Sequence, residues 1–216
     1  MDHAWSWLAL LLLGAFHGIN PGMGWLFAVA LGLQERSRRA VLRALAPLAL
    51  GHALAIGAAV VAALLLEAVL PPKLLKLPVA AILVTLGGWR LYRHRHPSGG
   101  GMRVGMAGLA LWSFLMASAH GAGLMVVPVF LSLAPPAAAA AGHHHYLHGA
   151  AASMAGWTAA AATLVHGAGY LLVTALAAVI VYEKVGIGIL RTAWVNVDLI
   201  WAAALILTGL AALAIG

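Results

Sequence analysis

The sequence contains no cysteine and few charged residues. Without cysteine, the 216-residue chain has no thiolate metal ligand, no disulfide and no CxxC redox pair. Charged residues make up 8% of the chain, against about 25% in soluble domains. Hydrophobic residues make up 64%, the mean hydropathy is +1.00, and several apolar runs exceed the roughly 20 residues that cross a bilayer. The sequence therefore predicts an all-α integral membrane protein.

Motifs of catalysis and nucleotide binding are also missing. The sequence has no HExxH, GxSxG or P-loop element, and no GxGxxG unit in a strand context. We therefore expect neither an enzyme nor a self-contained pump. The net charge of +7 is explained by basic loops of a membrane protein, so we expect no nucleic acid partner. Residues 1–4 lack the basic start of a secretory signal, so we expect no cleaved leader.

Six membrane spans are predicted from the apolar runs and the breaks between them. They cover residues 4–33, 41–70, 74–92, 104–133, 150–182 and 192–215. The first, third and fifth connecting loops hold ten of the 12 Lys and Arg residues. The positive-inside rule places these loops in the cytoplasm and both termini outside, in a bacterial inner (plasma) membrane.

The two halves of the chain resemble each other weakly. A Gly-rich linker over residues 98–103 separates a first three-helix unit, 1–97, from a second, 104–216. The pair His17-Gly18 matches His120-Gly121, and each half then has a long apolar span that contains a histidine and ends near a glutamate. Because each unit has an odd number of spans, the sequence predicts two inverted three-helix repeats. This arrangement is typical of secondary transporters, whose substrate site lies at the repeat interface.

Four histidines fall near the middle of predicted spans, two in each half: His17, His52, His120 and His166. Ionisable residues at this depth are costly and tend to line a substrate path or the bundle interior. Neutral imidazoles without thiolates suit Zn, Ni, Co or Cu, so these four are the predicted metal ligands. The alternative is that each histidine only hydrogen-bonds a neighbouring helix and fixes packing.

The stretch FHGINPGMGW interrupts the first apolar run. Pro21 removes a backbone donor, and three glycines let the chain unwind, which predicts a broken first helix with Asn20 near the substrate. Such a break is tolerated only where it faces protein or a watery cavity. Residues 120–123 are a softer counterpart and predict a broken fourth helix. A half-helix beginning after Pro21 has a positive end, which keeps an anionic substrate open.

Two further groups of residues are candidates for binding. Asp198 is the only carboxylate well inside a span, where it either handles a proton or cation or marks the membrane boundary. The outer loop before the fifth span is rich in histidine, as metal-binding tracts often are, although these residues are equally explained as incidental members of a low-complexity loop. These outer-loop residues are His143, His144, His145 and His148.

The segments HGINPG (17–22) and GHALAIG (51–57) resemble the small six-span exporters of the LysE superfamily, nearest to its nickel/cobalt (NicO-type) branch. The resemblance implies a 3+3 arrangement of spans, with His17, Asn20, Pro21 and His52 at polar positions of the pattern. This chain has Asn20-Pro21-Gly22 where a Pro-Asp-His type element would be expected.

Exporters of amino acids also belong to the superfamily, and its thiol–disulfide carriers are excluded by the absence of cysteine. We therefore expect a transporter that exports a divalent transition metal cation. The alternatives are an exporter of a small amino acid or other organic anion, and an accessory membrane subunit that transports nothing. A homo-oligomer is compatible with all three.

Overall fold

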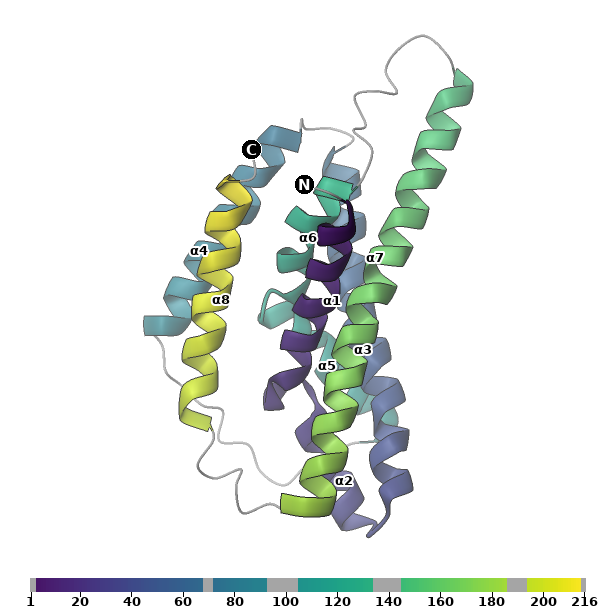
Figure 1. Cartoon of the computed structure of the whole chain (residues 1–216), viewed down its shortest axis with the longest axis vertical. Helices are drawn as coiled ribbons and strands as arrows, with labels where there is room; N and C mark the ends of the chain where they lie inside the picture. The colour runs from purple at the N-terminus through teal and green to yellow at the C-terminus, as the bar shows by residue number, and fades with distance from the viewer. Residues whose placement is uncertain (1–2, 68–71, 93–104, 134–144, 186–193, 215–216) are drawn as a thin grey trace.

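The computed structural model describes residues 3–67, 72–92, 105–133, 145–185 and 194–214, and every regular element in these residues is helical (Figure 1). In chain order the elements are α1 (His3–Ile19), the 3₁₀ turn η1 (Pro21–Met23), α2 (Trp25–Gln34), α3 (Arg38–Glu67), α4 (Pro72–Tyr92), α5 (Met106–Ala119), α6 (Ala122–Leu133), α7 (His145–Ile180), the π-helical turn η3 (Val181–Val185) and α8 (Trp194–Ala214). Each of the six predicted apolar segments therefore coincides with helix.

Two of these helices have the length and apolar composition of membrane spans. Arg38–Leu66 and Met154–Lys184 are each long and apolar enough to cross a membrane. The pair α5 and α6 qualifies as a third crossing if its two helices, bent by 66° at their junction, form one span. The apolar parts of α1, α2, α4 and α8 are shorter. The predicted linker 98–103 lies outside the described residues.

The most extensive packing joins helices from opposite halves of the chain. Helix α1 lies along α7, and α3 lies along α5. Both contacts use glycine: a Cβ added to Gly14 would overlap the backbone carbonyl of His166, and one added to Gly51 would overlap that of Ala110. Small residues at helix contacts let backbones approach closely, which drives association in lipid. The approach at Gly14 brings the turn of α1 that carries His17 against the turn of α7 that carries His166.

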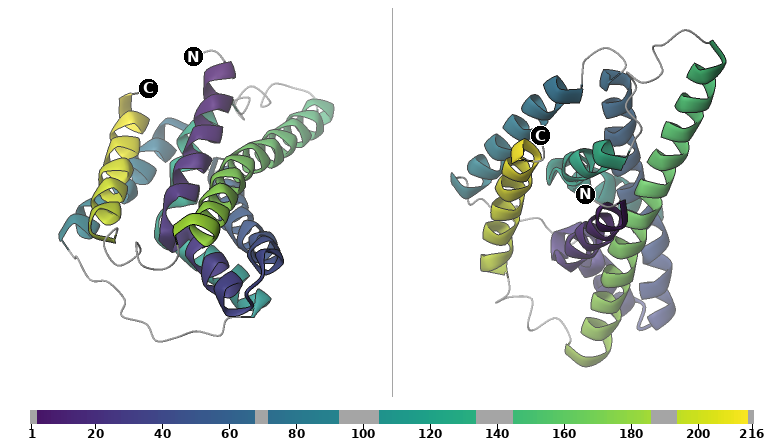
Figure 2. Two further views of the ribbon diagram at one scale, coloured as in Figure 1. Left: turned by 60° about the horizontal axis from the view of Figure 1, so that its bottom comes forward. Right: turned by 45° about the horizontal axis from the view of Figure 1, so that its top comes forward.

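Helices α4 and α8 form a third close pair, seen side by side in all three views (Figures 1 and 2). A Cβ on Gly87 of α4 would lie 2.9 Å from the carbonyl oxygen of Ala202, and one on Gly209 of α8 would lie 3.1 Å from that of Ala80. The pair touches the other helices through the cluster of Leu83, Leu205, Met23, Met125 and Tyr170. It therefore borders the interruption after α1.

Candidate functional site

The first predicted interruption is present between α1 and α2. Helix α1 ends at Ile19, and Pro21 begins η1, where its missing backbone N–H breaks no helical hydrogen bond. The Oδ1 atom of Asn20 accepts a hydrogen bond from the backbone nitrogen of Gly22 at 2.9 Å, which caps the short turn. Gly24 has φ +131°, a conformation that side chains rarely allow, and α2 starts directly after it.

Side chains donate hydrogen bonds to the carbonyl oxygens that the interruption leaves without regular helical geometry. The donors are the indole Nε1 of Trp25 to Ile19 at 3.0 Å, the indole Nε1 of Trp112 to Gly22 at 3.1 Å, and the hydroxyl of Tyr170 to Met23 at 2.7 Å. An unsatisfied backbone group in lipid costs several kcal/mol, so irregular backbone there must be satisfied by protein or water. Here side chains of α2, α5 and α7 satisfy these carbonyl oxygens.

Three of the four predicted histidines meet beside this interruption. His17 of α1, His52 of α3 and His166 of α7 each have 0% exposure. The ring centroid of His17 lies 5.0 Å from that of His166 and 5.7 Å from that of His52. The remaining pair, His52 and His166, has centroids 5.3 Å apart and ring planes within 4°. We call these three residues the histidine cluster.

His52 and His166 face each other through their Nε2 atoms, which are 3.2 Å apart. The centroid separation exceeds this distance by about one ring diameter, so the two rings lie head to head in a shared plane. One Nε2 therefore carries a proton and donates to the other, which accepts with its lone pair. Both Nδ1 atoms are buried; among the described residues that of His52 has no hydrogen-bond partner, and His166 interacts with the backbone of Leu10.

Backbone carbonyls fix the tautomers of His17 and His120. The Nδ1 atom of His17 lies 2.6 Å from the carbonyl oxygen of Leu13, and that of His120 lies 2.8 Å from the carbonyl oxygen of Met116. A carbonyl only accepts, so each Nδ1 is the donor. In the neutral ring the lone pair is then on Nε2, the nitrogen suited to a metal ion or a donated proton.

Tyr170 joins the histidine cluster to the interruption, and the sequence analysis missed it. Its ring stacks on the face of His52, with centroids 3.8 Å apart and planes within 6°, while its hydroxyl donates to Met23. The signal was available, because Tyr170 follows His166 by four residues and so shares its helix face. Ser113 was also missed; its buried hydroxyl donates to the carbonyl of Leu48, one turn before His52.

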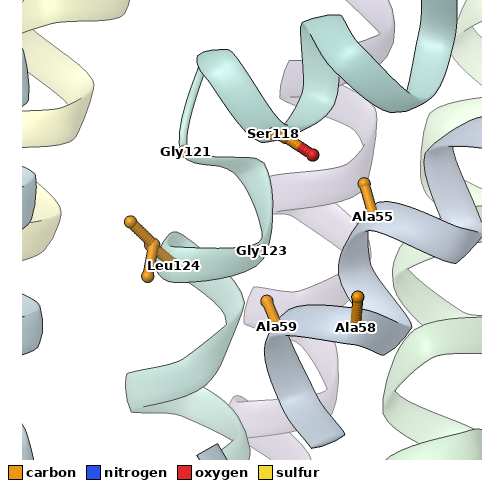
Figure 3. Close-up of a pocket in the computed structure, with 7 residues that line it drawn as sticks. All are labelled: Ala55, Ala58, Ala59, Ser118, Gly121, Gly123 and Leu124. Atoms are coloured by element: carbon orange, nitrogen blue, oxygen red, sulfur yellow. The ribbon is translucent and has the colours of Figure 1, made fainter. Parts of the chain in front are cut away.

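His120 lies at the second predicted interruption, between α5 and α6. Its backbone caps α5, Gly121 has φ +70°, and α6 begins at Ala122. The His120 side chain is buried, and the neighbouring Gly121 lines a pocket of about 220 Å³. Figure 3 shows the pocket between this bend and α3; its lining residues are Ala55, Ala58, Ala59, Ser118, Gly121, Gly123 and Leu124. Ala55 and Ala59 follow His52 by three and seven residues, so the pocket opens on the His52 face of α3.

Within the described residues, no group of three or more His, Asp or Glu side chains is arranged to hold a metal ion. The head-to-head rings explain this result. In a tetrahedral site two Zn–N bonds of roughly 2.0–2.1 Å place the nitrogens about 3.3 Å apart, close to the observed 3.2 Å, but the ion then lies off the line between the nitrogens. The lone pairs of head-to-head rings point along that line instead. Either ring must turn or move before both can bind one cation.

The other candidates are placed less fully. Asn20 is 5% exposed, and its buried Nδ2 has no hydrogen-bond partner in the part of the chain that the structure describes. Asp198 lies in the first turns of α8, and His145 and His148 lie in those of α7, but their side chains are outside the described set. His143 and His144 precede α7, outside the described residues.

Comparisons of the chain with protein-family models, with curated proteins and with solved structures found no match. The resemblance to the nickel/cobalt branch of the LysE superfamily stays a prediction from residues 17–22 and 51–57.

Proposed function

We propose that the protein is a six-span membrane transporter whose two three-helix halves are inverted repeats. The order of elements supports this: α1 with α2, α3 and α4 in the first half correspond to α5 with α6, α7 and α8 in the second. Each half opens with an interrupted segment that has His-Gly at or before the break. The packing has the same symmetry: α1 lies along α7, and their counterparts in the other half, α5 and α3, also lie along each other. Helix α1 begins and α8 ends at the same end of the molecule, as an even number of crossings requires (Figure 1).

The opposite end carries the basic residues of the first loop and is the proposed cytoplasmic side of a bacterial inner membrane. Arg38 at the start of α3 forms an ion pair with Glu183 of η3 at 3.3 Å, and Arg43 pairs with Glu35 at 2.5 Å. All four side chains are exposed, as expected for a membrane boundary facing water.

The proposed cargo is a divalent transition metal cation, and the observation that carries it is the histidine cluster. Three fully buried imidazoles, from α1, α3 and α7, converge. The proton of His17 is on Nδ1, so the lone pair of its neutral ring is on Nε2. The buried polar side chains among the described residues include no carboxylate, so oxygen-preferring cations are poorly served. His120 at the second interruption is the proposed fourth ligand. Binding requires the His52 and His166 rings to separate.

A second candidate cargo is a small organic solute such as an amino acid. Two observations favour it: the pocket of about 220 Å³ on the His52 face of α3, and the absence of a ready three-ligand arrangement among the described residues. In that case the histidine cluster would hydrogen-bond the solute or carry a proton.

Calorimetry with Zn²⁺, Ni²⁺ and Co²⁺ on the purified protein, together with uptake into proteoliposomes, tests the proposal. We expect binding near neutral pH, and at least about 10- to 100-fold weaker binding in separate His17→Ala, His52→Ala and His166→Ala variants. His144→Ala, in the predicted outer loop, is the control and should bind as the intact chain does. If the intact protein binds none of the three cations, the metal cargo is rejected and the organic solute takes its place.

A further inference from the structure

Tyr170 is held on three sides inside the bundle. Its side chain has 0% exposure, its ring stacks on His52, and its hydroxyl donates to the carbonyl of Met23 in η1. The backbone of α1 also packs directly on it, because a Cβ on Gly18 would lie 2.6 Å from the carbonyl oxygen of Tyr170. This one residue therefore touches α1, η1 and α3 at the same time.

His52 is confined by two residues of the same helix face. His166 meets it edge on through Nε2, and Tyr170, one turn later on α7, covers its face. If His52 turns away from His166, its ring must slide on or separate from the tyrosine ring. A displaced tyrosine ring pulls on the hydrogen bond to Met23, which has the usual length of a well-formed hydroxyl–carbonyl hydrogen bond, 2.7 Å.

We propose that Tyr170 is a positioning residue that couples the arrangement of the histidine cluster to the interruption between α1 and α2. The coupling is a property of the protein without cargo. The statement that cation binding drives it rests on the function proposed above. The stacked ring sets where His52 points, and the hydroxyl passes a change at His52 to the carbonyl of Met23. Trp112 supplies the internal comparison, because it donates to the same interruption at Gly22 while its ring packs against Phe27 of α2.

A double-mutant cycle read by hydrogen–deuterium exchange tests the coupling. The amides of residues 20–24 are followed in the intact chain, His52→Ala, Tyr170→Phe and the double variant. We expect His52→Ala to speed exchange about threefold or more when Tyr170 is present, and to have no further effect when phenylalanine replaces it. Equal effects of His52→Ala in both backgrounds would overturn the proposal.

Two more variants separate coupling from general loosening. In the Trp112→Phe background, which also loses one donor to the interruption, His52→Ala should still speed exchange. His52→Phe, which keeps a flat ring for Tyr170 to stack on, should protect residues 20–24 as the intact chain does. Exchange in the last turns of α8, beyond Leu205 and its cluster with Tyr170, reports whether each variant is folded. If His52→Ala also had no effect in the Trp112→Phe background, the loss of any donor would uncouple residues 20–24 from the cluster. Tyr170 would then have no special role.

Adding Zn²⁺ distinguishes failure of this inference from failure of the proposed function. The ion should alter exchange of residues 20–24 in the intact chain. In Tyr170→Phe it should bind within about twofold of the intact affinity yet leave that exchange unchanged, because the stacking surface remains and only the hydroxyl is lost. Absence of Zn²⁺ binding by the intact chain would reject the cargo while the cycle still decides the coupling. Equal Zn²⁺ responses in both proteins would reject the coupling while the cargo stands.

Discussion

His17 and His120 use the same local device, although their sequences differ on both sides. Each donates from Nδ1 to the carbonyl four residues earlier, and each is followed by a glycine at the end of its helix. The carbonyl, already near a helix end, gains a second donor, and the ring is held in one tautomer. The two halves therefore present an Nε2 lone pair at each interruption.

These tautomers give a pH prediction for cation binding. A protonated imidazole has no lone pair, so protons compete with the cation for the same nitrogen. We expect the affinity for Zn²⁺ to fall as pH is lowered from about 7.5 to about 5.5, a window that spans the ordinary histidine range. Calorimetry in buffers of different ionisation enthalpy measures both the affinity and the number of protons released. An affinity that stays constant down to the lowest pH at which the protein remains folded would be incompatible with imidazole ligands.

Single residues were only partly predictable. The four buried histidines follow from their mid-span positions, because ionisable side chains at that depth are costly and tend to face the bundle interior. Trp112 and Tyr170 do not, because their hydrogen bonds cross 90 and 147 residues of sequence and depend on how the helices pack. Aromatic residues in a membrane sequence also suit boundaries and lipid contact, which hides those that satisfy a broken backbone.

At the scale of helices, the interruptions were predictable and the helix pairing was not. Proline and glycine mark the end of α1, and His-Gly marks the end of α5, as the structure has them. The pairing of α1 with α7 and of α3 with α5 depends on glycines whose role is invisible in sequence. Gly14 and Gly51 meet a carbonyl, whereas Gly57, in the same apolar setting, has nothing within 4 Å of an added Cβ.

Gly51 and Gly57 provide a matched test of this pairing within α3. Gly51→Ala places a methyl group against the backbone of Ala110, so we expect a loss of about 1–3 kcal/mol as α3 and α5 separate. Gly57→Ala meets open space and gains helix propensity, so stability should be unchanged or up to about 1 kcal/mol higher. Reversible unfolding in mixed detergent measures both. Equal losses at the two positions would mean that the close approach of α3 and α5 contributes no stability.

At the scale of the whole molecule, the natural absence of cysteine makes the proposed orientation directly measurable. Ala4 near the start of α1 and Gln34 at the end of α2 are both exposed, at opposite ends of the first interrupted segment. We expect Ala4→Cys to react with a membrane-impermeant thiol reagent applied outside intact cells. Gln34→Cys should react only after the cells are opened, because the loops that hold ten of the 12 basic residues are predicted to lie on its side of the membrane. The reverse labelling pattern would mean that the topology is inverted, with the basic loops outside and both termini in the cytoplasm.

The bend between α5 and α6 also bears on how the protein fits its bilayer. Helices of 14 and 12 residues are about 21 and 18 Å long at 1.5 Å per residue. Laid straight they would measure about 39 Å, whereas the 66° bend leaves roughly 33 Å from end to end, close to the hydrocarbon thickness of about 30 Å. If α5 and α6 form one span, the bend reduces hydrophobic mismatch, and a thicker membrane would favour straightening at Gly121. Since Gly121 lines the pocket beside α3, acyl-chain length becomes a physical variable that acts on the shape of that pocket.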